Sequence, residues 1–442
     1  MRRLVSTPID TDARNGTACR LGSHGLLLDQ AFFGFTYREI SQELLMGSIV
    51  SLTIGGIEID WGKNNRFINH SKLFLPTDRT ILSEHEHNGT RYTLYGYRRA
   101  LRDVIPRLEL YGYSAKTIQK IWDENVSYYP EYYPKFELPF EQFAKVIKNV
   151  TIAPRTGSDQ GYDYDLGEFA QEMLNLPEYY QLKKAVNSNS ADLLSFFENL
   201  DPYIQLWLLS TNLENQNLYL EWHTDSIIKG GWTTEDDLFK SWADDRTFLI
   251  ITEGSSDTFI IKEAIALLRP DIKDFFTYID MTEHYPFTGT GNLFNFYKGL
   301  AKIGIKNRCL IVFDNDTEGV EKHQKCQNIS SPPSLASMTL PALSEFENAK
   351  TIGPNGAFKA NINGSAVSIE CFLDLSYKTN DPATIRWSSF NKDMGRYQGA
   401  LEGKEFYIAQ FKKALKNPEN YDFSKLQTLI THICEKCIAI PD

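Results

Sequence analysis

The amino-acid sequence predicts an α/β protein with a parallel β-sheet domain, preceded by an α+β N-terminal domain and followed by a helical segment. Three short apolar runs between residues 247 and 313 alternate with helical patterns, as in a parallel sheet with crossover helices. An alternating run on both sides of Gly55-Gly56 predicts a β-hairpin closer to the N-terminus. We therefore expect four parts: an N-terminal extension, an α+β domain, an α/β domain and a C-terminal helical segment, at residues 1–45, 46–240, 241–390 and 391–442.

The composition limits the possible functions. The 442 residues include 57 acidic and 46 basic side chains, and the formal net charge of −11 argues against a protein that coats nucleic acid by charge alone. The acid excess does not exclude an enzyme that reaches phosphate through a metal ion. Aromatic residues, at 13%, are numerous enough to shape cores or binding surfaces.

Cysteine usage and hydropathy predict the compartment. Six cysteines are too few for a disulfide scaffold, which favours the cytoplasm. Cys434 and Cys437 form a C-x-x-C without a second ligand pair, so we expect buried thiols on a terminal helix instead of a zinc site. The sequence predicts no membrane segment, because it lacks an apolar run of about 18 residues. Met1-Arg2-Arg3 also lacks the apolar region of a secretory signal.

The first 45 residues show neither helical nor strand periodicity. Two hypotheses fit this segment. Either translation naturally begins at Met46 and the leader is an upstream extension, or the leader is an ordinary N-terminal arm.

The N-terminal domain is expected to begin with the hairpin over Ser48–Trp61. A second alternating run covers Thr90–Tyr97 and leads into a helix, which Pro106 should end or restart. Ser114 is suited to cap the next helix, and residues 166–240 are mostly helical in pattern.

Three features of this half have both a functional and an ordinary interpretation. The aromatic loop Tyr128–Pro134 offers ring faces on which bases stack, although such clusters more often pack between domains. His85-Glu86-His87 would present two imidazoles to a metal on a strand, but its neighbours resemble a turn, so we expect a solvated polar loop. Arg79 and His85 have the R-x5-H spacing of HEPN ribonucleases, a pattern that also arises by chance.

The α/β domain is predicted from three buried strands. They are Phe248–Ile251, Phe275–Ile279 and Arg308–Phe313. Ser255 or Ser256 should cap the helix after the first strand, and Gly289-Thr290-Gly291 precedes the helix after the second.

Acidic residues follow all three strands: Glu253, Asp280, Asp314 and Asp316. Because the carboxyl ends of parallel strands meet at one edge of the sheet, these carboxylates should gather there. Their repulsion would be relieved by a divalent cation, and hard oxygen ligands favour Mg²⁺ or Mn²⁺ over zinc. The spacing suits phosphodiester chemistry, while the alternative is a set of solvated loop acids.

At these residues the chain resembles the Toprim family, the Rossmann-like catalytic domain shared by topoisomerases, bacterial primases and the OLD nucleases. The family pattern is a strand ending in Glu-Gly and a later strand ending in Asp-x-Asp with a following Gly. Here these are Glu253-Gly254 and Asp314-Asn315-Asp316 with Gly319, and the resemblance covers about Thr247 to Leu375.

Two further segments extend this resemblance. Val367–Leu373 is similar to a segment of OLD-type Toprim domains whose glutamate is an acidic site residue, which would add Glu370 to the cluster; the alternative is a surface helix glutamate. The segments at Met46-Gly47-Ser48 and Arg107–Tyr113 are similar to the HEPN/Toprim-associated N-terminal domain of bacterial defence proteins.

The resemblance implies roles for these residues. Asp314 and Asp316 would hold the metal, and Glu253 would be a metal ligand or a general acid/base. Asp280 is a further candidate ligand. Gly254 and Gly319 would let the backbone approach the ion and substrate, because neither has a Cβ.

Candidate nucleic-acid contacts lie both inside and outside this domain. Gly254 is one, and Lys404 is a candidate phosphate contact, although a lysine on an exposed helix is the ordinary interpretation. In the N-terminal half, Arg98 and Arg99 form a local basic segment that would attract substrate.

The departures from the family narrow the function. The chain has no P-loop and no zinc-binding cysteines of a primase, and no tyrosine is clearly placed as a topoisomerase nucleophile. The leading hypothesis is a Mg²⁺- or Mn²⁺-dependent endonuclease acting on DNA or RNA in bacterial antiphage defence. The alternatives are a toxin inhibited by a protein partner and a catalytically silent nucleic-acid-binding module; a regulatory partner or a homo-oligomer is also expected.

Overall fold

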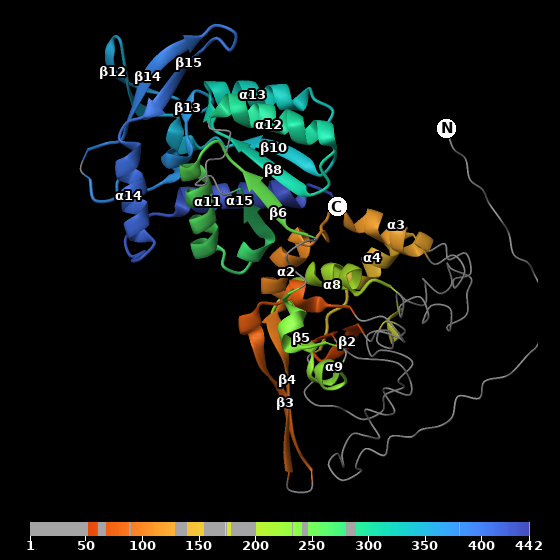
Figure 1. Cartoon of the computed structure of the whole chain (residues 1–442). Coiled ribbons are helices and arrows are strands. Elements are labelled where there is room, and N and C mark those ends of the chain that lie inside the picture. Colours follow the sequence, from red (N-terminus) through yellow and green to blue (C-terminus); the bar gives the residue numbers. More distant parts are fainter. Residues whose placement is uncertain are drawn as a thin grey trace, which may run out of the picture.

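The computed structural model describes residues 52–60, 68–87, 90–128, 139–153, 173, 175–177, 200–231, 233–240, 246–279, 289–379 and 381–441. These residues form an N-terminal part built on an antiparallel sheet and a second part built on a parallel sheet (Figure 1). The extension at 1–45, Met46, the aromatic loop after Tyr128 and Asp280 lie outside the described residues.

The N-terminal sheet is antiparallel and has the order β2-β1-β5-β4-β3. The predicted hairpin is present as β1 (Leu52–Ile54) and β2 (Ile57–Asp60). Gly55 and Gly56 both have positive φ, of 56° and 85°, which the tight turn between these strands requires. The remaining strands are β3 (Arg79–His87), β4 (Thr90–Ala100) and β5 (Tyr219–His223).

Two predictions for this sheet were wrong. The segment around His85-Glu86-His87 is not a polar loop, because β3 continues to His87 and pairs with β4 along its length. The mostly helical pattern predicted for 166–240 missed β5, a central strand paired with both β1 and β4.

The described helices of this part are α2 (Leu101–Leu110), α3 (Ile118–Tyr128), α4 (Phe140–Lys148) and α8 (Pro202–Ser210), with the shorter α9 (Asp225–Lys229) and α10 (Glu235–Leu238). Helices α2, α8 and α9 contact the antiparallel sheet, and α3 and α4 pack on α8. Every residue of α8 is buried. Contrary to the prediction, α2 continues through Pro106, since buried Leu101, Val104 and Leu108 hold the helix against the core.

The second part contains the predicted parallel sheet, in the order β10-β8-β6-β7. Its strands are β6 (Phe248–Ile251), β7 (Phe276–Tyr278), β8 (Arg308–Phe313) and β10 (Leu335–Thr339), and the crossover helices are α11 (Ser255–Leu268), α12 (Thr290–Ile303) and α13 (Thr317–Gln327). The strands β6, β7 and β8 confirm the three predicted apolar runs.

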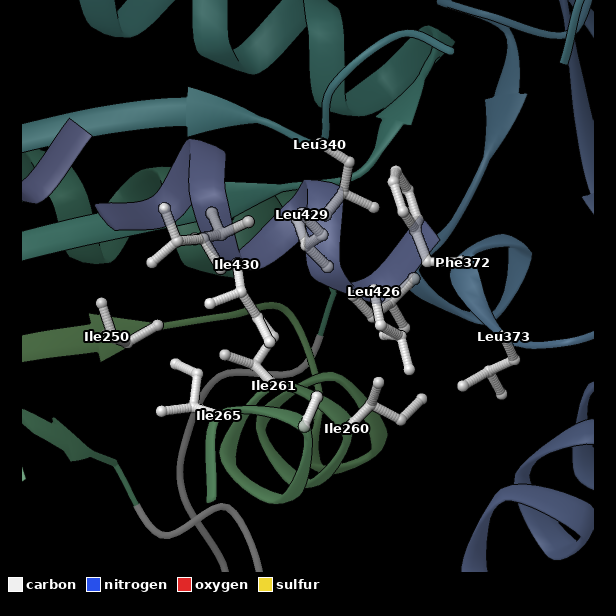
Figure 2. Close-up of a cluster of buried hydrophobic side chains, with 14 of the residues drawn as sticks. Ile250, Ile260, Ile261, Ile265, Leu340, Phe372, Leu373, Leu426, Leu429 and Ile430 are labelled. Atoms are coloured by element: carbon white, nitrogen blue, oxygen red, sulfur yellow. The ribbon is translucent and has the colours of Figure 1, made fainter. Parts of the chain in front are cut away.

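Both faces of this sheet are buried. Cys309, Ile311 and Phe313 of β8 pack with α12 on one face. Leu310 and Val312 belong to the opposite core, which includes residues of α11 and the C-terminal helix α15 (Ser424–Ile438). Figure 2 shows the side chains of β6, α11 and α15 in this second core. Because both faces are buried, each strand is a continuous run of apolar residues in the sequence.

The C-terminal region contains helices, as predicted for 391–442, but strand β15 (Arg396–Leu401) comes before them. An outer sheet of β12 (Gly356–Ala360), β11 (Ala349–Gly353), β14 (Thr384–Asn391) and β15 crosses the expected boundary at 390, which falls inside β14. The short pair β9 (Asn315–Asp316) and β13 (Ala366–Val367), the 3-10 turn η7 (Ile369–Phe372) and helix α14 (Lys404–Ala414) lie beside it. Helix α15 completes the core of the parallel-sheet domain.

Helix α15 also contains the C-x-x-C motif. Cys434 and Cys437 are buried thiols, as predicted. Among the described helices, none is long and apolar enough to cross a membrane.

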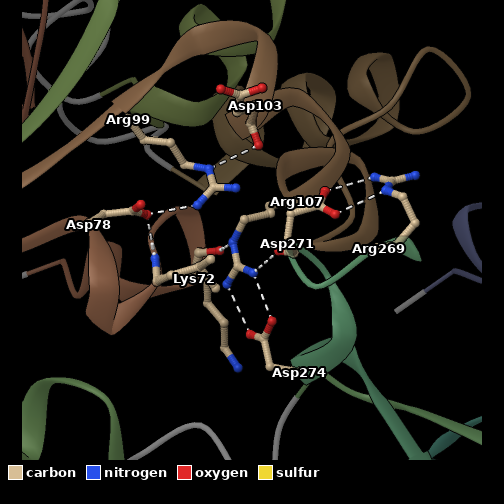
Figure 3. Close-up of polar contacts among 9 residues, drawn as sticks. Lys72, Asp78, Arg99, Asp103, Arg107, Arg269, Asp271 and Asp274 are labelled. Atoms are coloured by element: carbon tan, nitrogen blue, oxygen red, sulfur yellow. Dashed lines mark hydrogen bonds and ion pairs between the residues drawn. The ribbon is translucent and has the colours of Figure 1, made fainter. Parts of the chain in front are cut away.

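The two parts meet at the amino ends of the parallel strands, through Arg107 of α2 (Figure 3). Its fully buried guanidinium donates to Asp274 Oδ1 and Oδ2 at 2.8 and 2.9 Å, and to the Lys72 and Asp271 carbonyls. Nearby, Arg308 Nη1 donates to the Leu110 carbonyl at 3.2 Å. Leu110 packs into the core of the parallel-sheet domain.

Replacing Arg107 by alanine should destabilise the whole chain. Because Arg107 is buried and its loss leaves Asp274 without its guanidinium partner, we expect the free energy of unfolding to fall by about 3–5 kcal/mol, measured by urea denaturation. The control is Lys120→Ala, which removes an exposed ion pair with Glu124 and should cost less than about 0.5 kcal/mol. Equal effects of the two substitutions would contradict the importance of Arg107.

Candidate active site

The pairing of β6 with β8 brings the predicted acids together. The two strands are parallel and in register from Phe248 opposite Arg308 to Ile251 opposite Ile311, so that their carboxyl ends lie side by side. Glu253 follows β6 and Asp314 follows β8. The Asp314 amide donates to Glu253 Oε1 at 3.2 Å, and Thr290 Oγ1 donates to Oε2 at 2.8 Å. The end of β8 and the start of α12 thus both orient Glu253.

Asp316 is held at the start of α13. Its Oδ1 accepts from the Gly319 amide at 2.7 Å, which caps the helix, and its Oδ2 accepts from Gln398 Nε2 of β15. A Cβ at position 319 would lie 2.1 Å from the Asp314 carbonyl oxygen. Glycine at 319 therefore allows a close approach to the Asp314 backbone, while the predicted approach to an ion and substrate stays a prediction.

Gly254 lies between Glu253 and helix α11, and its predicted approach to an ion and substrate stays a prediction. A Cβ there would meet its nearest atom at 3.8 Å, so the position does not need glycine for space. Gly254 itself caps α11, in place of the expected Ser255 or Ser256, and its amide donates to Asp257 Oδ2 at 3.0 Å.

Asp257 lies close to Glu253 and Glu370, and the sequence interpretation did not include it among the candidate residues. Burial raises its pKa from 3.8 to about 7, and the charges of Glu370 and Glu253 add to this shift. The signal was present in the sequence as an acidic residue three positions after Gly254, where the first turn of a helix places it next to its cap.

Glu370 and Lys404 also belong to the site. Glu370, in η7, is 3% exposed, so it is not a surface helix residue. Its Oε2 lies 3.0 Å from Lys404 Nζ and accepts from Ser368 Oγ at 2.7 Å. Lys404 begins α14, and its amine points to the acids and not to open solvent as an exposed helical lysine would.

These five carboxylates and one lysine form what we call the acid cluster: Glu253, Asp257, Asp314, Asp316, Glu370 and Lys404. Burial raises the pKa of Asp314 well above its usual value, and the charges of Asp257, Glu253 and Asp316 raise it further. Burial likewise raises the pKa of Glu253. Burial opposes the charge of Lys404, but Glu370 and Asp314 keep its pKa above the ordinary value. The single positive charge of Lys404 does not neutralise the five carboxylates of the cluster.

The donor chemistry of the cluster suits a hard divalent cation, because carboxylate oxygens are the ligands that Mg²⁺ and Mn²⁺ prefer. Within the part of the chain that the structure describes, no three acidic, histidine or cysteine side chains already converge as metal ligands. Glu253, Asp314 and Asp316 would therefore have to draw together around the ion. Burial is the main cause of the raised pKa values of Glu253 and Asp314, and the charges of neighbouring acids add a repulsion that a cation would relieve.

Other candidate residues lie away from the cluster. Arg98 Nε donates to Glu221 at 2.7 Å, and Arg99 Nη1 donates to Asp78 at 2.8 Å, both within the N-terminal domain. Arg79 pairs with Glu235 in the same domain. The structure does not bring these arginines to the acids.

Comparison with known families identifies the N-terminal part. Residues 46–246 match the HEPN/Toprim N-terminal domain 1 family. The match covers the antiparallel sheet and its helices and ends before the parallel sheet. No curated protein and no solved structure matches the chain.

Gly319→Ala should destabilise the protein although alanine favours helices. The added Cβ would collide with the Asp314 backbone, so we expect the free energy of unfolding to fall by about 1–3 kcal/mol in urea denaturation. The control is Gly299→Ala in α12, where nothing lies within 4 Å of the new atom. That substitution should stabilise the protein by up to about 1 kcal/mol. A stabilising Gly319→Ala would refute the close approach.

The raised pKa of Asp257 predicts a pH dependence of stability in metal-free protein. The folded state holds a proton that the unfolded chain releases, so this contribution is complete below about pH 4 and is lost as the pH rises through about 7. Asp257→Asn cannot titrate. Urea denaturation in EDTA should show a smaller loss of stability from about pH 4 to 8 in this variant than in the parent. Parallel curves would mean that Asp257 titrates normally.

Proposed function

We propose that the chain is a Mg²⁺- or Mn²⁺-dependent nuclease that hydrolyses phosphodiester bonds in DNA or RNA. The observation that carries this proposal is the acid cluster, in which Glu253 and Asp314 meet at neighbouring strand ends with charge that Lys404 does not balance. The HEPN/Toprim N-terminal domain at 46–246 supports it, since the family name joins this domain to Toprim systems.

The residues of the cluster have distinct proposed roles. Glu253, Asp314 and Asp316 would hold the cation, with Glu370 and Asp280 as further acids. A metal bound there would polarise a phosphate oxygen of the substrate. Glu253 retains a proton at higher pH than an ordinary glutamate, which suits proton transfer to or from a reacting oxygen. Lys404 Nζ, beside Glu370, would stabilise phosphate charge at the rim of the site.

The biological setting rests on the resemblance alone. We propose an effector role in bacterial antiphage defence, with a toxin restrained by a partner as one form of it. A catalytically silent nucleic-acid-binding module is the second candidate function. It is favoured by the Lys404–Glu370 ion pair and by the lack of three converging ligands among the described residues.

Asp314→Asn should abolish cleavage without unfolding the protein. The substitution keeps the shape of the side chain but removes a ligand charge, so we expect the rate to fall at least about a hundredfold. The assay uses single-stranded DNA, duplex DNA, single-stranded RNA and transfer RNA, each with Mg²⁺, Mn²⁺ or EDTA.

The matched control is Glu435→Gln, an exposed acid on α15 outside the cluster, which should cut like the parent. Circular dichroism verifies the fold of each variant. If the parent cuts none of the substrates with either metal, the nuclease hypothesis is rejected in favour of the catalytically silent binding module. Cleavage that persists in EDTA and in Asp314→Asn would overturn the assigned site.

A further inference from the structure

The outer sheet carries a row of aromatic rings, of which Trp387 is half-buried against the core and the others are exposed. Phe390 of β14 lies opposite Tyr397 of β15, with ring centroids 4.9 Å apart, and Trp387 is 6.3 Å from Tyr397. Phe390 and Tyr397 are 50% and 53% exposed. Two large rings held together in solvent stabilise the hairpin by their mutual contact, but they leave their outer faces free to stack on other flat groups.

Phe358 of β12 extends the row across the sheet. A Cβ on Gly353 of β11 would lie 3.4 Å from Phe358 and 3.5 Å from Trp387, so this glycine separates the two rings without covering them. Phe358 is 48% exposed. We call Phe358, Trp387, Phe390 and Tyr397 the aromatic row. It crosses four strands, or about 14 Å at the usual strand spacing.

The outer sheet is basic in a chain that is acidic overall. Its two hairpins, residues 349–360 and 384–401, contain Asp393 as their one acidic side chain and five basic ones: Lys350, Lys359, Arg386, Lys392 and Arg396. Lys359 and Arg396 lie on the two edge strands, β12 and β15. Lys359 and Arg396 are the strand neighbours of Phe358 and Tyr397, and neighbouring residues of a strand point to opposite faces. These two cations therefore lie behind the row, where they contribute long-range attraction for a phosphate backbone.

One end of the row adjoins the acid cluster. The Tyr397 carbonyl accepts from Thr317 Oγ1 at 2.9 Å, and the next residue, Gln398, donates to Asp316. Ala366, whose strand β13 pairs with Asp316, lies beneath Gly399 of β15. A chain lying on the row therefore leads to the acids at the β15 edge. In Figure 1 the outer sheet is at the end of the molecule away from the described residues of the N-terminal domain, and those residues leave it uncovered.

We propose that the aromatic row is the binding platform for single-stranded nucleic acid and directs the bound strand toward the acid cluster. This inference rests on the proposed nuclease function and adds a substrate form to it. Ring faces stack on unpaired bases of any sequence, and duplex bases are not available for such stacking. A four-stranded sheet with exposed rings accommodates two or three bases.

The test is equilibrium binding of fluorescein-labelled 20-nucleotide single strands, of DNA and of RNA, in the Asp314→Asn background where the probe is not cut. Phe390→Ala with Tyr397→Ala should weaken binding about fivefold to a hundredfold, the usual effect of losing a stacked base. Tyr397→Phe keeps the ring face and should bind like the parent. Lys359→Ala with Arg396→Ala removes charge from the opposite face, so it should weaken binding less than the loss of the two rings and reduce the salt dependence of binding.

The control is Tyr219→Ala, an aromatic residue 56% exposed on β5 of the N-terminal domain, which should leave binding unchanged. Unchanged binding of Phe390→Ala with Tyr397→Ala, or a preference for duplex over single strands, would overturn the platform. Cleavage by the otherwise unmodified chain is measured separately. If the chain cuts no substrate but the ring substitutions weaken binding, the nuclease is refuted and the platform stands. If the chain is an active nuclease and the ring substitutions change neither KM nor binding, only the platform is refuted.

Discussion

The parallel pairing of β6 with β8 is the constraint on which the site depends. All six residues of β8 are buried, and its two faces pack into different cores. A slip of one residue would exchange the two faces, so packing on both sides fixes the register. That register places the residues after β6 and β8 next to each other, and the Glu253–Asp314 contact follows from it. The acids repel one another, so the apolar core must supply the energy that keeps them together.

The two ends of the strands in the parallel sheet have different neighbours. Arg107 and Arg308 join the N-terminal domain to the amino ends of the strands, whereas the acids occupy the carboxyl ends. A six-residue strand such as β8 spans about 20 Å, so a partner on the N-terminal domain need not cover the acids. Any influence between these surfaces would have to pass through the packed strands.

Much of the fold followed from local patterns, and the site followed only in part. The strands β6, β7 and β8 were predictable because burial on both faces produces unbroken apolar runs, and Gly55-Gly56 marked its hairpin. Strand β5 was not, since its five residues lie in a helix-rich region and pair with β1 and β4, more than a hundred residues earlier in the chain. Glu253, Asp314 and Asp316 follow strands and could be predicted from topology. Whether Glu370 and Lys404 face solvent or the acids depends on how η7 and α14 pack, which no local pattern encodes. Pro106 shows the same limit, because tertiary packing outweighs its local preference.

Helix α15 makes the order of synthesis matter. Leu426, Leu429, Ile430 and Ile433 form one side of the core that β6 and α11 share, yet they are translated more than 150 residues after those elements. Until α15 is synthesised, the apolar side chains of α11 that face it have no cover. A nascent or prematurely terminated chain thus has the strands that carry Glu253 and Asp314 but not the core that holds their register. Completion of the core that holds β6 and β8 in register therefore comes after translation of the acidic residues, because α15 follows them in the chain.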